Sequence, residues 1–285
     1  MKSRSLAVPI VVLALLTGAC GRSGGDGGGG PAIEHPTGPN DLVLRVETGG
    51  GFVAPAWALK QIPQLSLYGG GRLITQGPQI EIYPGPALPN LVAETVSEGG
   101  VQAILEAAQK AGLMGPDAHY ECAGIFDAPT TTFTLFAAGE KHVVSAYALG
   151  MDQGTCEGSD VEARSKLAVF QANLSDLSNW LPQGSVGEPS SFEASELRLY
   201  VQPYAGPSDQ GLRQQPIDWP LSEPLASFGR SEATFADMRC GVVRGSDLAL
   251  LLPEAERANE LTPWRSEGKK HSLVFRPLLP DEHTC

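Results

Sequence analysis

Apolar and polar residues alternate in several short segments of the first third of the chain, as they do in half-buried β-strands. The clearest segment is Asp41–Glu47, DLVLRVE, which a threonine and three glycines follow. Three prolines make Tyr83–Pro89 a loop, because proline lacks the backbone donor that a strand needs. Gly69–Gly71 is typical of a hairpin turn between two of the predicted strands. These further strands are predicted, in chain order, at 64–68, 72–76, 79–83 and 90–96.

The middle of the chain changes to helical spacing and then to a second hairpin. Apolar residues from Val101 to Leu113 follow a helical period, and Gly112 ends a helix predicted at about 98–111. Two alternating segments, 130–136 and 141–149, surround Ala138-Gly139 and predict the hairpin.

A second helix is predicted to begin at Ser159, because Ser159 and Glu162 have the spacing of a capping box. Its apolar residues step by four, three, four, three and four, which places them on one face. They are Ala163, Leu167, Phe170, Leu174, Leu177 and Leu181. This spacing favours one continuous helix that covers a sheet; a coiled coil is the alternative.

The last third is less regular. A clean strand is predicted at 196–202, and residues 203–231 are rich in Pro, Gly, Ser and Gln, which predicts a course over the surface. Strands are also predicted at 239–243 and 272–275. A helix is predicted between them at 246–259, and Pro253 is expected either to kink it or to delay its start.

The order of these elements predicts an α+β fold: antiparallel sheets built from hairpins, with two or three helices packed on one face. A doubly wound parallel sheet would need strict strand–helix alternation, which the pattern lacks. Residues 41–285 are expected to form one α+β domain, with two subdomains as the alternative.

Composition narrows the class of protein. A hydrophobic share of 42% can build a core, and 34 glycines with 23 prolines predict many turns and short elements. The net charge of −12 would repel nucleic acid, so no DNA- or RNA-binding role is expected.

Residues 1–19 have the organisation of a secretory signal. Lys2 and Arg4 precede an apolar stretch of 11 residues, Leu6–Leu16, which is too short for a permanent membrane span. Small residues then lead to Cys20. The segment resembles a bacterial lipoprotein signal, although Thr17 stands where the lipobox usually has an aliphatic residue. The resemblance implies cleavage after Ala19 and a diacylglyceryl group on the Cys20 thiol.

Residues 20–40 are expected to be the lipidated cysteine followed by a flexible Gly/Pro-rich tether, with a reach of about 25 Å. His35 is interpreted as a solvated residue of this tether. Removal of residues 1–19 takes away two basic residues and no acidic one, which leaves a net charge of −14. Because an anionic leaflet repels such a chain, the lipid itself must provide the anchoring.

Four cysteines remain after Cys20, an even number that favours disulfides in an oxidising compartment. Three connectivities are open, and Cys122–Cys156 with Cys240–Cys285 is favoured because each pair closes its loop within one block of sequence. A metal site would need close pairs such as C-x-x-C, which are missing from the sequence.

The sequence contains no G-x-S-x-G, H-E-x-x-H, Walker or EF-hand motif, and it predicts no cofactor and no metal site. Ser266–Lys269 matches S-x-x-K, but its companion motifs are missing, so a loop is the favoured interpretation. His119–Cys122 is the densest cluster of reactive residues and with His142 could form a metal site; a disulfide flanked by polar residues is favoured. His271 and the acidic end at Asp281–His283 are interpreted as a strand start and a solvated tail.

The four tryptophans are expected mainly in the core, with an exposed ligand or partner surface as the alternative. They are Trp57, Trp180, Trp219 and Trp264.

Beyond the signal, the chain resembles uncharacterised lipoproteins of GC-rich Gram-positive bacteria. The segments that carry this resemblance are Val46–Phe52, Tyr83–Pro89 and Arg276–Glu282. It implies an extracytoplasmic protein held at the cell membrane by lipid, and no site residues come with it.

The sequence thus favours a non-catalytic lipoprotein that binds an envelope protein or a small ligand; the alternative is an exported hydrolase. A deep pocket in which His, Ser and carboxylates converge would favour the enzyme. A face with exposed aromatic residues would favour the binding protein.

Overall fold

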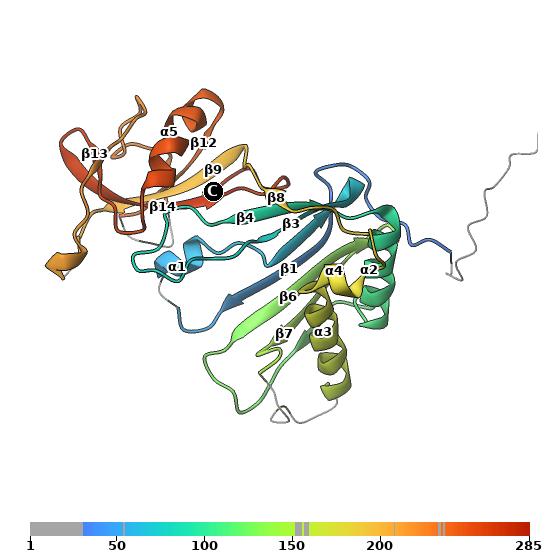
Figure 1. The fold of residues 1–285 in the computed structure, drawn as a ribbon. Helices are drawn as coiled ribbons and strands as arrows, with labels where there is room; N and C mark the ends of the chain where they lie inside the picture. Colours follow the sequence, from blue (N-terminus) through green and yellow to red (C-terminus); the bar gives the residue numbers. More distant parts are fainter. Residues whose placement is uncertain are drawn as a thin grey trace, which may run out of the picture. The chain divides into compact units, whose positions relative to one another are not determined.

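Two mixed β-sheets, one of eight strands and one of six, organise the chain (Figure 1). The computed structural model describes residues 31–53, 55–151, 156, 160–207, 209–232, 235 and 237–285. Five helices accompany the sheets among these residues. The α+β class predicted from the sequence is therefore confirmed.

The eight-stranded sheet is antiparallel except for one short edge pair, β5 with β7. Its strands, in spatial order, are β5 (Ala118–Tyr120), β7 (Glu140–Tyr147), β6 (Pro129–Ala137), β1 (Leu42–Gly50), β2 (Leu65–Tyr68), β3 (Arg72–Gln76), β4 (Leu91–Thr95) and β8 (Ser190–Ser191). The β2–β3 and β6–β7 pairs are the two predicted hairpins.

Side chains of this sheet and of three helices form one hydrophobic core. The helices are α2 (Glu98–Lys110), α3 (Val161–Leu174) and α4 (Leu177–Trp180). Val46 on β1 lies opposite Phe133 on β6, and the Phe133 ring centroid lies 6.0 Å from that of Phe170 on α3. Strand side chains alternate between the two faces of a sheet, and Val46 and Phe133 both lie on the buried face.

The predicted continuous helix ends at Leu174, and α4 follows as a separate short helix. Leu167, Phe170, Leu174, Leu177 and Leu181 are nevertheless all buried, so the apolar spacing identified the correct residues. Ser159, the predicted cap, lies outside the described residues.

The six-stranded sheet has its own core and carries α5 (Gly245–Arg257). Its strands, in spatial order, are β10 (Ile217–Asp218), β13 (Trp264–Ser266), β14 (Lys269–Pro277), β9 (Glu196–Pro203), β12 (Arg239–Arg244) and β11 (Arg230–Ser231). Helix α5 begins ahead of Pro253, so the proline does not delay its start. Ser266 and Lys269 are paired at the β13–β14 turn, so the S-x-x-K match belongs to a hairpin.

Two predictions for irregular segments are wrong. Residues 203–231 do not simply follow the surface: Trp219, Leu225 and Phe228 are buried in the core of the second sheet. Residues 79–83 form no strand, and Ile80 and Ile82 are exposed. Alternation alone misleads there, since among the described residues no strand pairs with that segment.

One compact unit spans Ile33–Cys285, and residues ahead of β1 contact its first sheet. The Ile33 backbone N–H donates to the Gln102 side chain on α2, and the Glu34 backbone carbonyl oxygen accepts from the Ala138 N–H at the β6–β7 turn. The His35 side chain is only 6% exposed and lies 3.1 Å from Glu98. Its interpretation as a solvated tether residue is therefore wrong.

The C-terminal segment connects the two sheets. Asp281 accepts hydrogen bonds from Arg45 (2.7 Å) and from the Tyr68 hydroxyl (2.8 Å), both in the first sheet. Glu282 forms a bidentate ion pair with Arg276 on β14. Asp281 and Glu282 of the predicted solvated acidic tail are thus partly buried in ion pairs, because strand residues supply the compensating arginines.

Candidate functional site

Both predicted disulfides are present: Cys122–Cys156 and Cys240–Cys285, with Cα–Cα distances of 4.8 and 6.0 Å. The second disulfide fastens the C-terminus to β12. Cys20, the predicted lipidation site, lies outside the described residues.

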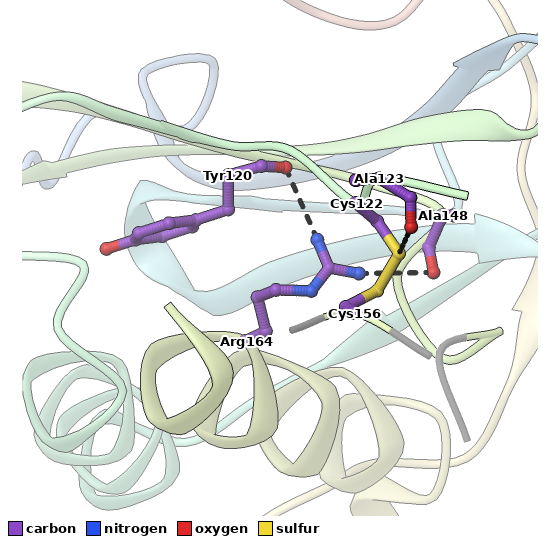
Figure 2. Close-up of a disulfide and its surroundings, with 6 residues drawn as sticks. All are labelled: Tyr120, Cys122, Ala123, Ala148, Cys156 and Arg164. Atoms are coloured by element: carbon purple, nitrogen blue, oxygen red, sulfur yellow. Dashed lines mark hydrogen bonds between the residues drawn. A yellow bond between two sulfur atoms is a disulfide. The ribbon is translucent and has the colours of Figure 1, made fainter. Parts of the chain in front are cut away.

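Figure 2 shows how the first disulfide and Arg164 hold the segment after β5. Arg164 on α3 is 1% exposed, and its guanidinium donates to the carbonyl oxygens of Tyr120 and Ala148. Burying an arginine requires such partners, since an unsatisfied buried charge is costly. His119 and Glu121 are therefore adjacent to a segment that a disulfide and a buried arginine hold in place.

His119 contacts both a serine and a carboxylate, but its two ring nitrogens are exchanged relative to a Ser-His-Asp triad, in which Nε2 faces the serine and Nδ1 faces the carboxylate. Its Nδ1 lies 2.7 Å from Ser145 Oγ, and its Nε2 lies 2.8 Å from Glu121 Oε1. The side chains of His119 and Glu121 are 51% and 74% exposed. Ser145 lies between β5 and β6, where its backbone is paired on both sides. This cluster thus lies on an exposed surface of the sheet.

The other histidines do not join this cluster. His142 is buried and contacts the Gly115 carbonyl oxygen. His271 lies in the second sheet, where burial and then the charge of Lys269 lower its pKa. Among the described residues, no group of three or more His, Cys, Asp or Glu side chains could hold a metal ion.

A groove of about 620 Å³ combines apolar walls with exposed aromatic rings. Its floor includes β9 and β14 of the second sheet, and α1 (Pro55–Leu59) and the 83–87 loop contribute residues from the first. Trp57, Tyr83 and Tyr204 bring aromatic rings to it, and Pro86, Pro203 and Pro207 add rigid apolar surface.

Glu260 holds the walls of this groove together. It accepts hydrogen bonds from Lys60 Nζ (3.0 Å) and from the Gly85 N–H (3.1 Å). Burial acts to raise the pKa of Glu260, but these hydrogen bonds and the Lys60 charge outweigh it and lower the pKa. Backbone bonds between Glu260 and Gly85 and between Ala87 and Ala258 add to the support. The groove is therefore preformed, which lowers the entropic cost of binding.

Comparison with known protein families, curated proteins and solved structures finds no match to this chain. In the part of the chain that the structure describes, no helix has the length and apolar character needed to cross a membrane. The candidate site therefore follows from geometry.

The tryptophans divide between the core and the groove. Trp264 and Trp219 are buried in the second core, and Trp180 packs against Phe170. Trp57 is 47% exposed and lines the groove, which sequence reasoning offered only as an alternative.

Proposed function

We propose that this protein is an extracytoplasmic lipoprotein, held at the cell membrane by lipid on Cys20, whose aromatic groove binds a ligand or partner. The lipid on Cys20 is the membrane contact, and the bound molecule is an envelope protein or a small ligand. Nucleic acid is not among the proposed partners, since the chain carries a net charge of −12.

The envelope location is supported by the charged head and 11-residue apolar stretch before Cys20. Two disulfides are compatible with it, because such bonds persist in oxidising compartments.

One observation carries the binding function: aromatic residues remain exposed around a preformed groove. Trp57 and Tyr83 are 47% and 65% exposed although the chain has two cores available to bury them. Aromatic rings with a polar edge are favoured where a bound molecule completes the burial.

Fluorine NMR of the full chain with fluorotryptophan tests this function. The probes are a proline-rich peptide, a basic apolar peptide, a chito-oligosaccharide and a fatty acid. We expect at least one probe to shift the Trp57 resonance, assigned through Trp57→Phe, while the buried Trp264 resonance stays unchanged. The Tyr83→Ala variant should bind that probe at least about fivefold more weakly. No Trp57 shift with any probe would contradict the proposal.

The Ser145–His119–Glu121 cluster supports a second candidate, an exported hydrolase. Screening of the full chain against ester, peptide, glycoside and phosphate substrates tests it. Turnover that His119→Gln and Ser145→Ala both abolish, while His283→Gln leaves it intact, would establish the enzyme. The binding function predicts no turnover in the parent protein.

A further inference from the structure

Three loops leave the same end of the eight-stranded sheet. Gly50 at the end of β1 pairs with Pro129 at the start of β6, and Leu65 of β2 pairs with both Val46 and Thr75. The loops at 51–53, 77–90 and 121–128 are therefore neighbours at one end, here called the distal end.

The distal loops expose large apolar side chains that belong to neither hydrophobic core. Phe52 is 93% exposed, Phe126 is 85% exposed, and Ile80 and Ile82 are both more than half exposed. Gly51 lies against the backbone of Asp127, which brings the first and third loops together. Single exposed apolar residues are ordinary, but a group of them at one end marks an interaction surface.

This surface is continuous with the proposed binding groove. Trp57 follows the first loop, Tyr83 belongs to the second, and both line the groove. Glu260 fixes the second loop through Gly85.

The charges on the distal loops have one sign. Residues 77–90 carry Glu81 and no basic residue, and residues 121–128 carry Glu121 and Asp127 and no basic residue. The groove contains Asp209 and Glu260 against Lys60, which already pairs with Glu260. Such a surface attracts positive charge beside its apolar contacts.

The distal end lies away from the point where the domain begins. Ile33 and Glu34 contact α2 and the β6–β7 turn, at the end where β1 starts. The nine residues of β1 separate the two ends by about 27 Å.

From this placement we infer that the distal loops and the groove together dock a polypeptide segment with apolar side chains flanked by Lys or Arg. This inference rests on the proposed binding function of the groove and assigns its partner class. An anionic bilayer is a poor occupant, because the chain carries a net charge of −12. A second copy is also disfavoured, because it would bring the same acidic loops together.

Binding of designed peptides to the full chain tests the inference. The probe is a short peptide of leucine, lysine and glycine; one twin has glutamate for lysine, and another has serine for leucine. We expect the basic apolar peptide to bind at least about tenfold more tightly than either twin, and added salt to weaken it. Phe52→Ser with Phe126→Ser should weaken binding by about fivefold or more. Glu81→Lys should weaken the binding of the basic peptide and strengthen the binding of its acidic twin.

Leu250→Ser on α5 and Val169→Ser on α3 are matched controls, since both parent side chains are exposed outside the distal end. They should leave binding unchanged. Equal binding of the basic and acidic twins, or insensitivity to Phe52 and Glu81, would overturn the inference. The inference would also be overturned if the parent protein bound anionic vesicles and the Phe52 variant did not. It would likewise be overturned if the parent protein self-associated and the Phe52 variant did not. If another probe shifts the Trp57 resonance while the basic peptide does not bind, the inference fails and the groove's binding function stands.

Discussion

Asp281 shows how one carboxylate near the C-terminus connects distant parts of the molecule. It lies between Arg45 and Tyr68, which come from β1 and β2. Burial acts to raise the pKa of Asp281, but the hydrogen bonds and charge of Arg45 and the Tyr68 hydroxyl outweigh it and lower the pKa. The Tyr68 pKa is raised, first by burial and then by Asp281. The ionised aspartate is thus part of the folded state.

The lowered Asp281 pKa predicts a pH-dependent stability. Because the unfolded chain binds the proton more readily, the stabilisation is complete above the unfolded pKa of about 4 and is lost as the pH falls below it. Asp281→Asn should lower the free energy of unfolding by about 2 kcal/mol at neutral pH and flatten its acid dependence. Urea titrations at several pH values measure both effects. Glu188→Gln, at an exposed position, is the control, and an equal loss in both variants would contradict the prediction.

At the scale of elements, α3 is a helix whose buried face the sequence predicted although its length was not. Its apolar spacing identified Leu167, Phe170 and Leu174, all buried in the structure. The buried Arg164 was not anticipated, since its partners are carbonyl oxygens of β5 and of the segment after β7. The periodicity predicts which face is covered, but it carries no information about a polar contact between elements.

Phe170 and Val169 provide a matched test of this packing. The Phe170 ring contacts the Phe133 and Trp180 rings, whereas Val169 is 58% exposed on the same helix. Phe170→Ala should lower the free energy of unfolding by about 3–4 kcal/mol, because it leaves a cavity in the core. Val169→Ala should change it by less than about 0.5 kcal/mol. Denaturant unfolding of both variants measures the difference, and similar losses would contradict the role of Phe170.

At the scale of the whole molecule, two sheets with separate cores both contribute to the candidate groove. The groove takes α1 and the 83–87 loop from the first and β9 and β14 from the second. The Arg45–Asp281 ion pair and the hydrogen bond from Arg276 to the Gln61 carbonyl oxygen connect the two. Weakening either connection should therefore alter the groove as well as the stability.

The proposed lipid on Cys20 makes a prediction about the full chain in its native host. Cys20→Ser should abolish labelling by a radioactive or clickable fatty acid and move the protein from the membrane to the soluble fraction, because stable anchoring needs the acyl chains. Ser23→Ala is the nearby control and should label like the parent. Labelling and membrane retention of the Cys20 variant at the parent level would refute the lipoprotein assignment.

The spacing of apolar residues in the sequence by itself determined those strands and helices whose buried face depends on residues close together in the chain. Most predicted strands, the helix at 98–111 and the buried positions of α3 followed from alternation or helical period, since each element's own residues encode its buried face. The disulfide pairing followed from loop closure within one block of sequence.

Only the tertiary structure decided the features that depend on contacts between distant segments. It buried Trp219 and Phe228 from a segment that looked exposed, and it left Ile80 and Ile82 outside both cores. It placed Lys60 next to Glu260 at the groove, and it placed Arg45 next to Asp281, an ion pair that connects the two sheets. These pairs lie far apart in the chain, so their attraction leaves no periodic signal in the sequence and arises only when the sheets meet.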